Sequence, residues 1–440
     1  MSMINNTAKA YTGTATSRVD GRAKVTGAAK YAGDFNAGGL AYGAVVEATI
    51  ARGRIARIDA SEALRVPGVI DVITHENRPP VADSDEAWKD DVAPEEGSPF
   101  RPLYDDAVKF NQQPIALVLA EEWEIARYAA SLVRVDYEKQ PFVTDVYRKR
   151  DDAIVVEKPD KPRGNAAKAF AAAEVRHEAD YFIPTEHHNP MELFASTAMW
   201  ETGGPLTVYD KTQGVQNVHG FLCGVFEKEP DEIRVISPYV GGAFGAGLRP
   251  QYHVVLAVMG ALKLQRSVRL VLTRQQMYGL GYRPATIERL TLGARRDGTL
   301  DAITHEAVGT TSRFEEFSRN DTGWSALLYA SPNARYEHRV AQLDVPTSCD
   351  MRAPGAATGV YALESAMDEL AVALKMDPVQ LRLRCYSERD QNEDLPYTSK
   401  RLRECYREGA AAFGWDRRKP EPRAMRDGKT LVGWGMASGV

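Results

Sequence analysis

Residues 241–247 form the stretch with the clearest capacity for chemistry, a glycine loop with the sequence GGAFGAG. It follows a segment of strand character and precedes one of helix character. Glycine allows the backbone to bend and to bring N–H groups close to a ligand, and such N–H groups at a strand-to-helix junction typically bind anions. The spacing matches neither G-x-G-x-x-G nor G-x-x-x-x-G-K-[ST], which disfavours a nucleotide-binding enzyme. A tight turn in a packed junction stays open as the alternative.

Two other polar clusters deserve comparison with the glycine loop. Residues 186–192 read EHHNPME, and their two histidines and two carboxylates suggest a metal site. Adjacent side chains point apart in a strand or a helix, so we interpret this segment as a polar turn that ends at Pro190. Residues 349–355 read CDMRAPG, where the guanidinium of Arg352 suits contact with an anion. A solvated arginine is the alternative there.

Nucleophilic catalysis finds no support in the residue pattern. The four cysteines form no C-x-x-C pair, and we interpret them as free thiols in a reducing compartment. There is no G-x-S-x-G sequence and no ordered Ser-His-Asp or Cys-His arrangement.

The elements that must position these clusters fall into two regions. Residues 1–17 are expected to be a loose tail. Residues 18–145 alternate strand, helix and strand, which predicts a compact α+β domain. Within it we expect a short helix with Ser61 as its N-cap and a long surface loop over 79–106. The other expected elements of this domain are a strand near 41–50, a strand at 69–73, a buried strand at 114–120, a helix at 121–132 and a strand at 133–137.

The second region begins after a charged stretch, residues 146–175, which we interpret as a linker. Residues 176–440 are expected to form the second domain. Asp297-Gly298 is a strong hairpin signal between two alternating strands. The remaining expectations are strands at 195–200, 206–209, 232–237 and 268–272, and helices at 212–222, 254–264, 361–374 and 399–413, the first of them lying beneath a bound ligand.

Composition and charge exclude several classes of function. A length of 440 residues suggests two or three domains, and 44% hydrophobic with 26% charged residues is ordinary for a globular protein. A net charge of −5 gives no electrostatic case for nucleic acid or an anionic membrane as a partner. No apolar run reaches the ~20 residues that span a bilayer. The N-terminus resembles no secretory signal, so we expect the cytoplasm, or the periplasm only if a partner carries the signal.

Taken together, the segments resemble the molybdopterin-binding large subunit of the xanthine dehydrogenase, aldehyde oxidoreductase and carbon monoxide dehydrogenase family. Residues 17–34 resemble its opening signature, and 40–75 with 112–138 resemble its hammerhead-type α+β domain. The later motifs occur in the family's order: 188–192 with 198–200, Thr212-Gln213, the glycine loop, 271–274, 283–285 and 351–355. The resemblance covers nearly all of residues 17–440.

The resemblance implies a site and a chemistry. Gln213 matches the glutamine near the apical ligand of molybdenum, Phe244 and Gly245 match the Phe-Gly pair against the metal's ligand sphere, and Arg352 matches the cofactor-loop arginine. Gly242, in the same loop, completes the expected cofactor-binding set. In the family the pterin dithiolene holds the metal, so no protein metal ligand is expected. The implied reaction is hydroxylation of an aldehyde or N-heterocycle with water as the oxygen source. Electrons pass to a [2Fe–2S] subunit and then to a flavin (FAD) subunit, and the cytosine dinucleotide form of the molybdopterin is one alternative.

Three positions depart from the pattern of particular members. Leu248 stands where purine-oxidising members have a glutamate. Near Ser325, where those members have a substrate arginine, there is no convincing match, and the nearest arginine is Arg319. Ala353 stands where carbon monoxide dehydrogenases have a cysteine. These departures favour an aldehyde-like substrate.

The resemblance also implies that the family's large subunit is longer than this chain. We therefore expect the C-terminal cofactor domain, with the glutamate general base, to be missing or incomplete, and no residue here is assigned as the base. Glu192 is one candidate for that role, but there is no geometric reason to place it at the metal. The isolated 440-residue chain is then expected to be inactive. The alternative is a truncated, non-catalytic remnant, or half of a split subunit, that contributes only cofactor or subunit contacts.

Overall fold

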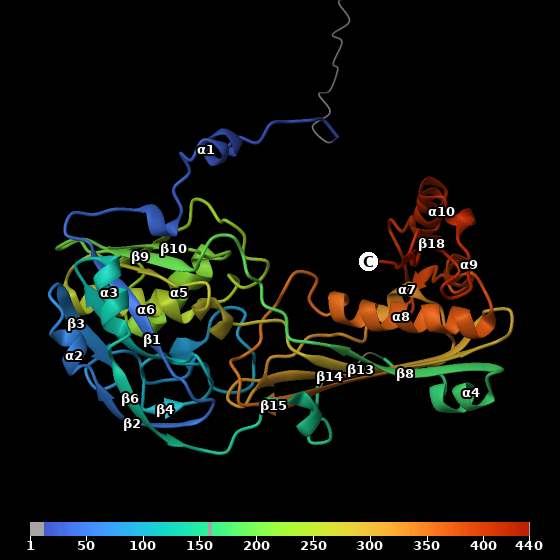
Figure 1. Ribbon diagram of the computed structural model, residues 1–440, viewed down its shortest axis with the longest axis horizontal. Helices are drawn as coiled ribbons and strands as arrows, with labels where there is room; N and C mark the ends of the chain where they lie inside the picture. Colours follow the sequence, from blue (N-terminus) through green and yellow to red (C-terminus); the bar gives the residue numbers. More distant parts are fainter. Residues whose placement is uncertain (1–12, 157–160, 440) are drawn as a thin grey trace, which may run out of the picture.

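The computed structural model describes residues 13–156 and 161–439, which form two bodies, each built on one large sheet (Figure 1). Of the expected tail, residues 1–12 lie outside the described part, and residues 13–17 are exposed and without regular structure. The short helix α1 (Gly21–Val25) buries none of its residues and stands away from the first body. No helix of the described residues combines the length and the apolar character needed to cross a membrane.

The first body contains a seven-stranded sheet that joins both regions of the sequence. Its order is β11 (Ile233–Ile236), β10 (Leu206–Asp210), β9 (Ala195–Met199), β12 (Val268–Val271), β1 (Ala41–Glu47), β5 (Pro114–Ala120) and β3 (Val69–Thr74). The seam is the parallel pair β1–β12, where Ala41 lies opposite Val268. The expected boundary after residue 145 therefore divides the sequence into two regions, but strands from both regions form this one sheet. Strand pairing across such a seam leaves no local signal in the sequence.

Strand β5 shows why its segment is a continuous apolar run. All seven of its residues are buried. Leu117 and Leu119 join the core beneath helix α6 (Tyr252–Leu264), whereas Ala116 and Val118 pack with Ala129 of helix α3 (Trp123–Ala130). Because alternate side chains of a strand point to opposite faces, helices cover this sheet on both sides.

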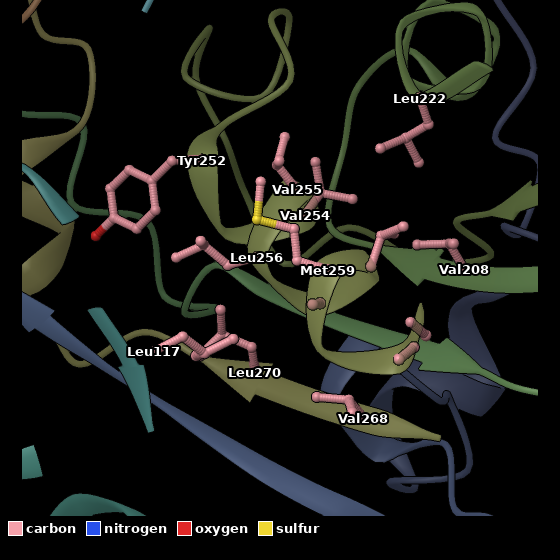
Figure 2. Close-up of a cluster of buried hydrophobic side chains, with 14 of the residues drawn as sticks. Leu117, Val208, Leu222, Tyr252, Val254, Val255, Leu256, Met259, Val268 and Leu270 are labelled. Carbon is pink, nitrogen blue, oxygen red and sulfur yellow. The ribbon is translucent and has the colours of Figure 1, made fainter. Parts of the chain in front are cut away.

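Helix α6 lies at the centre of the main core, as Figure 2 shows. Its residues Val254 to Met259 are at most 1% exposed, so the helix is apolar around its whole circumference. They pack with Val208 and Leu270 of the sheet and with Leu222 of helix α5 (Val215–Phe226). Burial on this scale fixes the position of Gln251 and of the glycine loop that precedes the helix.

A smaller sheet completes the first body. Strand β2 (Gly53–Asp59) pairs with β6 (Arg134–Lys139) and β4 (Ala107–Val108) in antiparallel fashion. The short helix α2 (Ser61–Leu64) follows β2. Its N-cap is Ala60 and not Ser61 as expected, because the Asp59 carboxylate already accepts the N–H of Ser61 at 3.0 Å. The other short elements of this body are 3₁₀ helices η1 (Ala32–Asp34), η2 (Glu86–Trp88) and η4 (Gln276–Gly279), whereas η3 (Val146–Arg148) packs on the second body through Val146.

The second body is a long five-stranded sheet with helices on both faces (Figure 1). The strand order is β7 (Ile154–Val155), β15 (Ala334–Leu343), β14 (Leu300–Ser312), β13 (Thr286–Ala294) and β8 (Val175–Ile183). Strands β13 and β14 form the hairpin predicted at Asp297-Gly298, where Gly298 has a φ of 87°. Helix α8 (Ala356–Leu374) packs on β8 and β13, and α4 (Ala166–Ala172) packs below. The remaining elements are α7 (Trp324–Leu328), α9 (Pro378–Arg384), α10 (Leu402–Phe413), η5 (Trp415–Arg417), β16 (Arg389–Asp390), β17 (Leu395–Pro396), β18 (Arg426–Asp427) and β19 (Thr430–Leu431).

Three expectations about connecting segments are wrong. Over its described residues, the expected linker 146–175 contains β7 and α4 and belongs to the second sheet. The expected surface loop 79–106 carries Trp88 and Leu103, which are 1% and 3% exposed within the main core. The helix expected at 212–222 begins at Val215, so Gln213 lies in the turn before it. In the first two cases the charged or polar composition concealed a few residues that long-range packing buries, whereas the third is a shift in where the helix begins.

Candidate functional site

The glycine loop follows strand β11 and has a backbone that only glycine tolerates at one point. Gly242 and Gly245 have φ values of 90° and 113°, and Phe244 between them has a φ of 57°. A Cβ on Gly245 would overlap the backbone carbonyl of Asp350. The loop therefore lies in direct backbone contact with residues 349–352, which is a packing reason for the glycine in addition to its positive φ.

Gln213 holds the loop from the opposite side. Its side-chain oxygen accepts the N–H of Gly245 at 3.0 Å and that of Gly247 at 3.3 Å. Its own N–H donates to the carbonyl of Gly247 at 2.8 Å. Because both loop N–H groups require an acceptor, the orientation of the amide is fixed and its NH₂ group is the part left free to donate. Gln213 is exposed, so this NH₂ group is available at the surface of the site.

Arg352 reaches the same loop through its main chain. The N–H of Arg352 donates to the carbonyl of Phe244 at 2.8 Å, and its own carbonyl accepts from the Arg283 guanidinium at 2.9 Å. Ala353 and Gly355 follow with φ values of 59° and 69°. The backbone of Arg352 is thus fixed on both sides. Its side chain is exposed and has no hydrogen-bond or ion-pair partner within residues 13–156 and 161–439.

The turn at residues 186–192 supports both loops. His188 Nε2 donates to the carbonyl of Asp350 at 2.7 Å, and burial lowers the pKa of His188, which keeps it neutral. Arg274 donates to the Asn189 side chain at 2.9 Å and to the Met191 carbonyl at 3.0 Å. Across the described ranges, no group of three His, Cys, Asp or Glu side chains is arranged to hold a metal ion.

Glu192 and Lys211 lie behind the glycine loop. The Glu192 carboxylate accepts the N–H of Gly241 at 2.6 Å, and burial raises its pKa. Lys211 is 1% exposed, with its ammonium 3.5 Å from the centre of the Phe194 ring. Burial lowers its pKa to about 8, although Glu192 and Asp210 oppose the change. Sequence reasoning overlooked Lys211, since a lone lysine beside a strand usually lies in solvent.

The structure therefore brings together the five residues that the sequence singled out. Gln213 and Arg352 contact the loop of Gly242, Phe244 and Gly245, and the Phe244 ring is 47% exposed. Each of the three side chains is exposed, and within the described residues neither the Gln213 NH₂ group nor the Arg352 guanidinium has a hydrogen-bond partner. An amide donor, a guanidinium and an aromatic ring are side chains that suit an anionic ligand with a planar part.

Comparison with known proteins identifies the class. Residues 147–386 match the model of the molybdopterin cofactor-binding domain, and residues 26–141 match that of the aldehyde oxidase and xanthine dehydrogenase a/b hammerhead domain. The chain belongs to this family of molybdenum-binding oxidoreductase subunits. The fold class that the sequence predicted, a hammerhead-type domain followed by the first cofactor-binding domain, is confirmed.

Individual relatives agree with this assignment. The chain is 36% identical to the aldehyde oxidoreductase molybdenum-binding subunit PaoC of Escherichia coli, over 96% of this chain and 57% of that protein. It is 28% identical to the putative xanthine dehydrogenase molybdenum-binding subunit of the same species, over 92% and 56%. The solved structure of the Desulfovibrio gigas aldehyde oxidoreductase superposes with a TM-score of 0.78 at 27% identity, covering 90% of this chain and 46% of that one. The chain thus spans about half the length of each of these three proteins.

Proposed function

We propose that this chain supplies one wall of a molybdopterin site in a molybdenum hydroxylase that oxidises aldehydes. The observation that carries the proposal is the contact of Gln213 and Arg352, from distant parts of the sequence, with the same glycine loop. Both present free donors on its exposed side. The names of the relatives, which are aldehyde and xanthine oxidoreductase subunits, support the same reading.

The residues present fit this cofactor. A group held through its own dithiolene needs hydrogen-bond donors and close backbone from the protein. Gly245 provides the close approach, because it has no Cβ. The Gln213 amide donates, the Arg352 guanidinium binds an anionic edge, and the Phe244 ring covers the wall and excludes water. When bound, the cofactor supplies a two-electron oxidation in which water provides the oxygen.

Substrate and partners extend the proposal. Leu248 is an apolar residue directly after the glycine loop and gives a purine no carboxylate to bind, so we propose an aldehyde, with an N-heterocycle as the second candidate. We further propose that electrons leave through a [2Fe–2S] subunit and an FAD subunit, and that the pterin carries cytosine dinucleotide. Among the residues that the structure describes, Glu192 is the acidic residue whose side chain hydrogen-bonds the glycine loop backbone, and it binds Gly241 behind the loop. We therefore propose that the 440 residues alone do not turn over aldehydes.

The test is the cofactor content of the full chain, produced in cells that make molybdopterin. Molybdenum and pterin are measured in the wild-type chain, in Gln213→Glu and in the control Gln216→Glu, whose side chain is exposed. Gln213→Glu keeps the oxygen acceptor for the loop but removes the amide donor. We expect it to retain at least fivefold less molybdenum than the wild type and the control. Equal content in all three, or no molybdenum in the wild type, would contradict the proposed site.

The substrate class is tested separately with the holoenzyme that contains this chain together with the proposed iron–sulfur and flavin partners. We expect this holoenzyme to reduce a dye with benzaldehyde as substrate and to show no activity on xanthine. Activity on xanthine alone would overturn the assignment to aldehydes.

A further inference from the structure

Arg249 is the second residue after the glycine loop, and its guanidinium is shared between two carboxylates. It bonds Asp90 through Nε at 2.8 Å and Glu315 through both terminal nitrogens at 3.0 and 2.8 Å. The side chains are 15%, 3% and 4% exposed, respectively. The fork on Glu315 is the bidentate geometry that arginine forms and lysine does not.

The two carboxylates come from segments that are far apart in the sequence. Asp90 follows η2 in the segment that the main core anchors through Trp88. Glu315 lies in the turn after β14 of the second body and forms an isolated bridge with Gly97. Arg249 therefore ties the glycine loop to the first body and to the second body at one point.

A chain of contacts leads from this ion cluster back to Gln213. Asn217 of α5 donates to the carbonyl of Leu248 at 3.0 Å and to the Asp90 carboxylate at 3.2 Å. The N–H of Leu248 donates to the carbonyl of Gly245 at 3.0 Å. Leu248 thus connects Arg249 to Gly245, and the N–H groups of Gly245 and Gly247 orient the Gln213 amide.

Several groups hold the glycine loop, among them the Gln213 side chain, the backbone of Arg352 and the cluster around Arg249. Its four glycines give the backbone wide freedom, and it forms neither strand nor helix. At its upstream end Gly241 is bound by Glu192. At its downstream end Thr212 Oγ1 donates to the Gly247 carbonyl at 3.1 Å and Gln251 donates to the Ala246 carbonyl at 2.9 Å. The residues that follow are held by the Arg249 cluster and by Asn217.

We propose that Arg249 is a positioning residue, which sets the glycine loop and through it the donor direction of Gln213. The importance of the Gln213 donor direction for cofactor binding rests on the proposed function. The positioning of the loop by Arg249 does not depend on it. An ion cluster that merely stabilises the fold would, when removed, loosen the whole first body. Removing a positioning cluster would loosen the loop, while the amides of the sheet beneath would stay protected from exchange.

Amide hydrogen exchange on the full chain distinguishes these roles. We expect Arg249→Met to accelerate exchange of Gly245 and Gly247 at least tenfold, with the amides of β5 and β9 unchanged. Arg249→Lys retains the charge without the fork and is expected to restore only part of the protection. The control is Arg266→Met, which removes an arginine paired with Glu121 at 2.5 Å at a more exposed site, and it should leave the loop amides as they are.

Two results would overturn the proposal: unchanged loop exchange in folded Arg249→Met, or equal acceleration throughout the first body. If Arg249→Met does not fold, Glu315→Gln removes one carboxylate charge while Asp90 keeps Arg249 paired, and the same comparison is made with it. Molybdenum content is measured in parallel. A wild-type chain without molybdenum would count against the proposed function while the exchange result still decides the role of Arg249.

Discussion

The side-chain oxygen of Gln213 accepts the N–H of Gly245 at 3.0 Å across 32 residues of sequence. This bond turns the amide so that its NH₂ group is free on the exposed side. It also joins the turn before α5 to the loop before α6. The geometry of the proposed site therefore depends on the loop backbone as much as on the side chains that face the cofactor.

Gly245→Ala should destabilise the protein and misplace the loop. The substitution forces a Cβ into the Asp350 carbonyl at a φ of 113°, and strain of this kind costs about 1–3 kcal/mol in the free energy of unfolding. Chemical denaturation measures the loss. The matched control is Gly220→Ala in α5, where a Cβ meets no atom within 4 Å, and it should stabilise by about 0.5–1 kcal/mol. Equal effects of the two variants would rule out the steric argument.

Arg352→Ala should separate binding from stability. The side chain is exposed and unpaired within the described ranges, so its removal should change the free energy of unfolding by no more than about 0.5 kcal/mol. Molybdenum content should nevertheless fall several-fold, whereas Arg65→Ala, at another exposed arginine, should leave it unaltered. A variant that binds normally, or that loses stability, would show that the guanidinium has a different role.

Glu47→Gln should make stability less dependent on pH. Burial raises the pKa of Glu47 from 4.5 to about 7, and the Tyr252 hydroxyl only partly opposes this. The folded state then binds the proton more tightly than the unfolded state. The resulting cost is absent below pH 4.5 and complete above pH 7, so wild-type stability falls through this window.

The expected gain from Glu47→Gln is about 2 kcal/mol at pH 8, less than the full shift at ~1.4 kcal/mol per pKa unit because the carboxyl keeps some contact with solvent. At pH 4.5 the gain should vanish. Urea denaturation at both pH values provides the measurement, with Glu138→Gln on the exposed face of β6 as the control. A gain that is the same at both pH values would argue against titration of Glu47.

Arg382→Met should strongly destabilise the fold. Arg382 lies far from the glycine loop in the sequence. Arg382 is fully buried and bonds Glu364 of α8 at 2.8 Å and Asp368 at 2.8 Å. Its removal leaves Glu364 buried without its cation, which costs about 3–5 kcal/mol. The neighbouring Arg384→Met removes an exposed pair with Asp297 at 3.8 Å and should cost under about 1 kcal/mol. Thermal unfolding compares the two variants. Similar midpoints would contradict the argument that an unpaired, buried Glu364 carboxylate destabilises the folded state.

Much of the fold could be predicted from local patterns. The apolar run 114–120 coincides with β5, and Asp297-Gly298 marks the β13–β14 hairpin. Family membership followed from motifs in order and is confirmed. The roles of Gln213, Gly242, Phe244, Gly245 and Arg352 stay predictions. The linker and the surface loop were wrong, because Trp88 is buried by residues far away in the sequence and the exposed strand β7 pairs with the distant strand β15.

The sequence by itself determined which backbone positions could bend, which segments were apolar enough to be buried, and which motifs belonged together. The tertiary structure alone decided that β1 pairs with β12, that Gly245 lies against Asp350, and that Arg249 binds two carboxylates from separate segments. The physical reason is the distance along the sequence over which each effect acts. Periodicity and glycine content act over a few residues, whereas strand pairing, close backbone packing and buried ion pairs depend on partners that only the folded chain brings together.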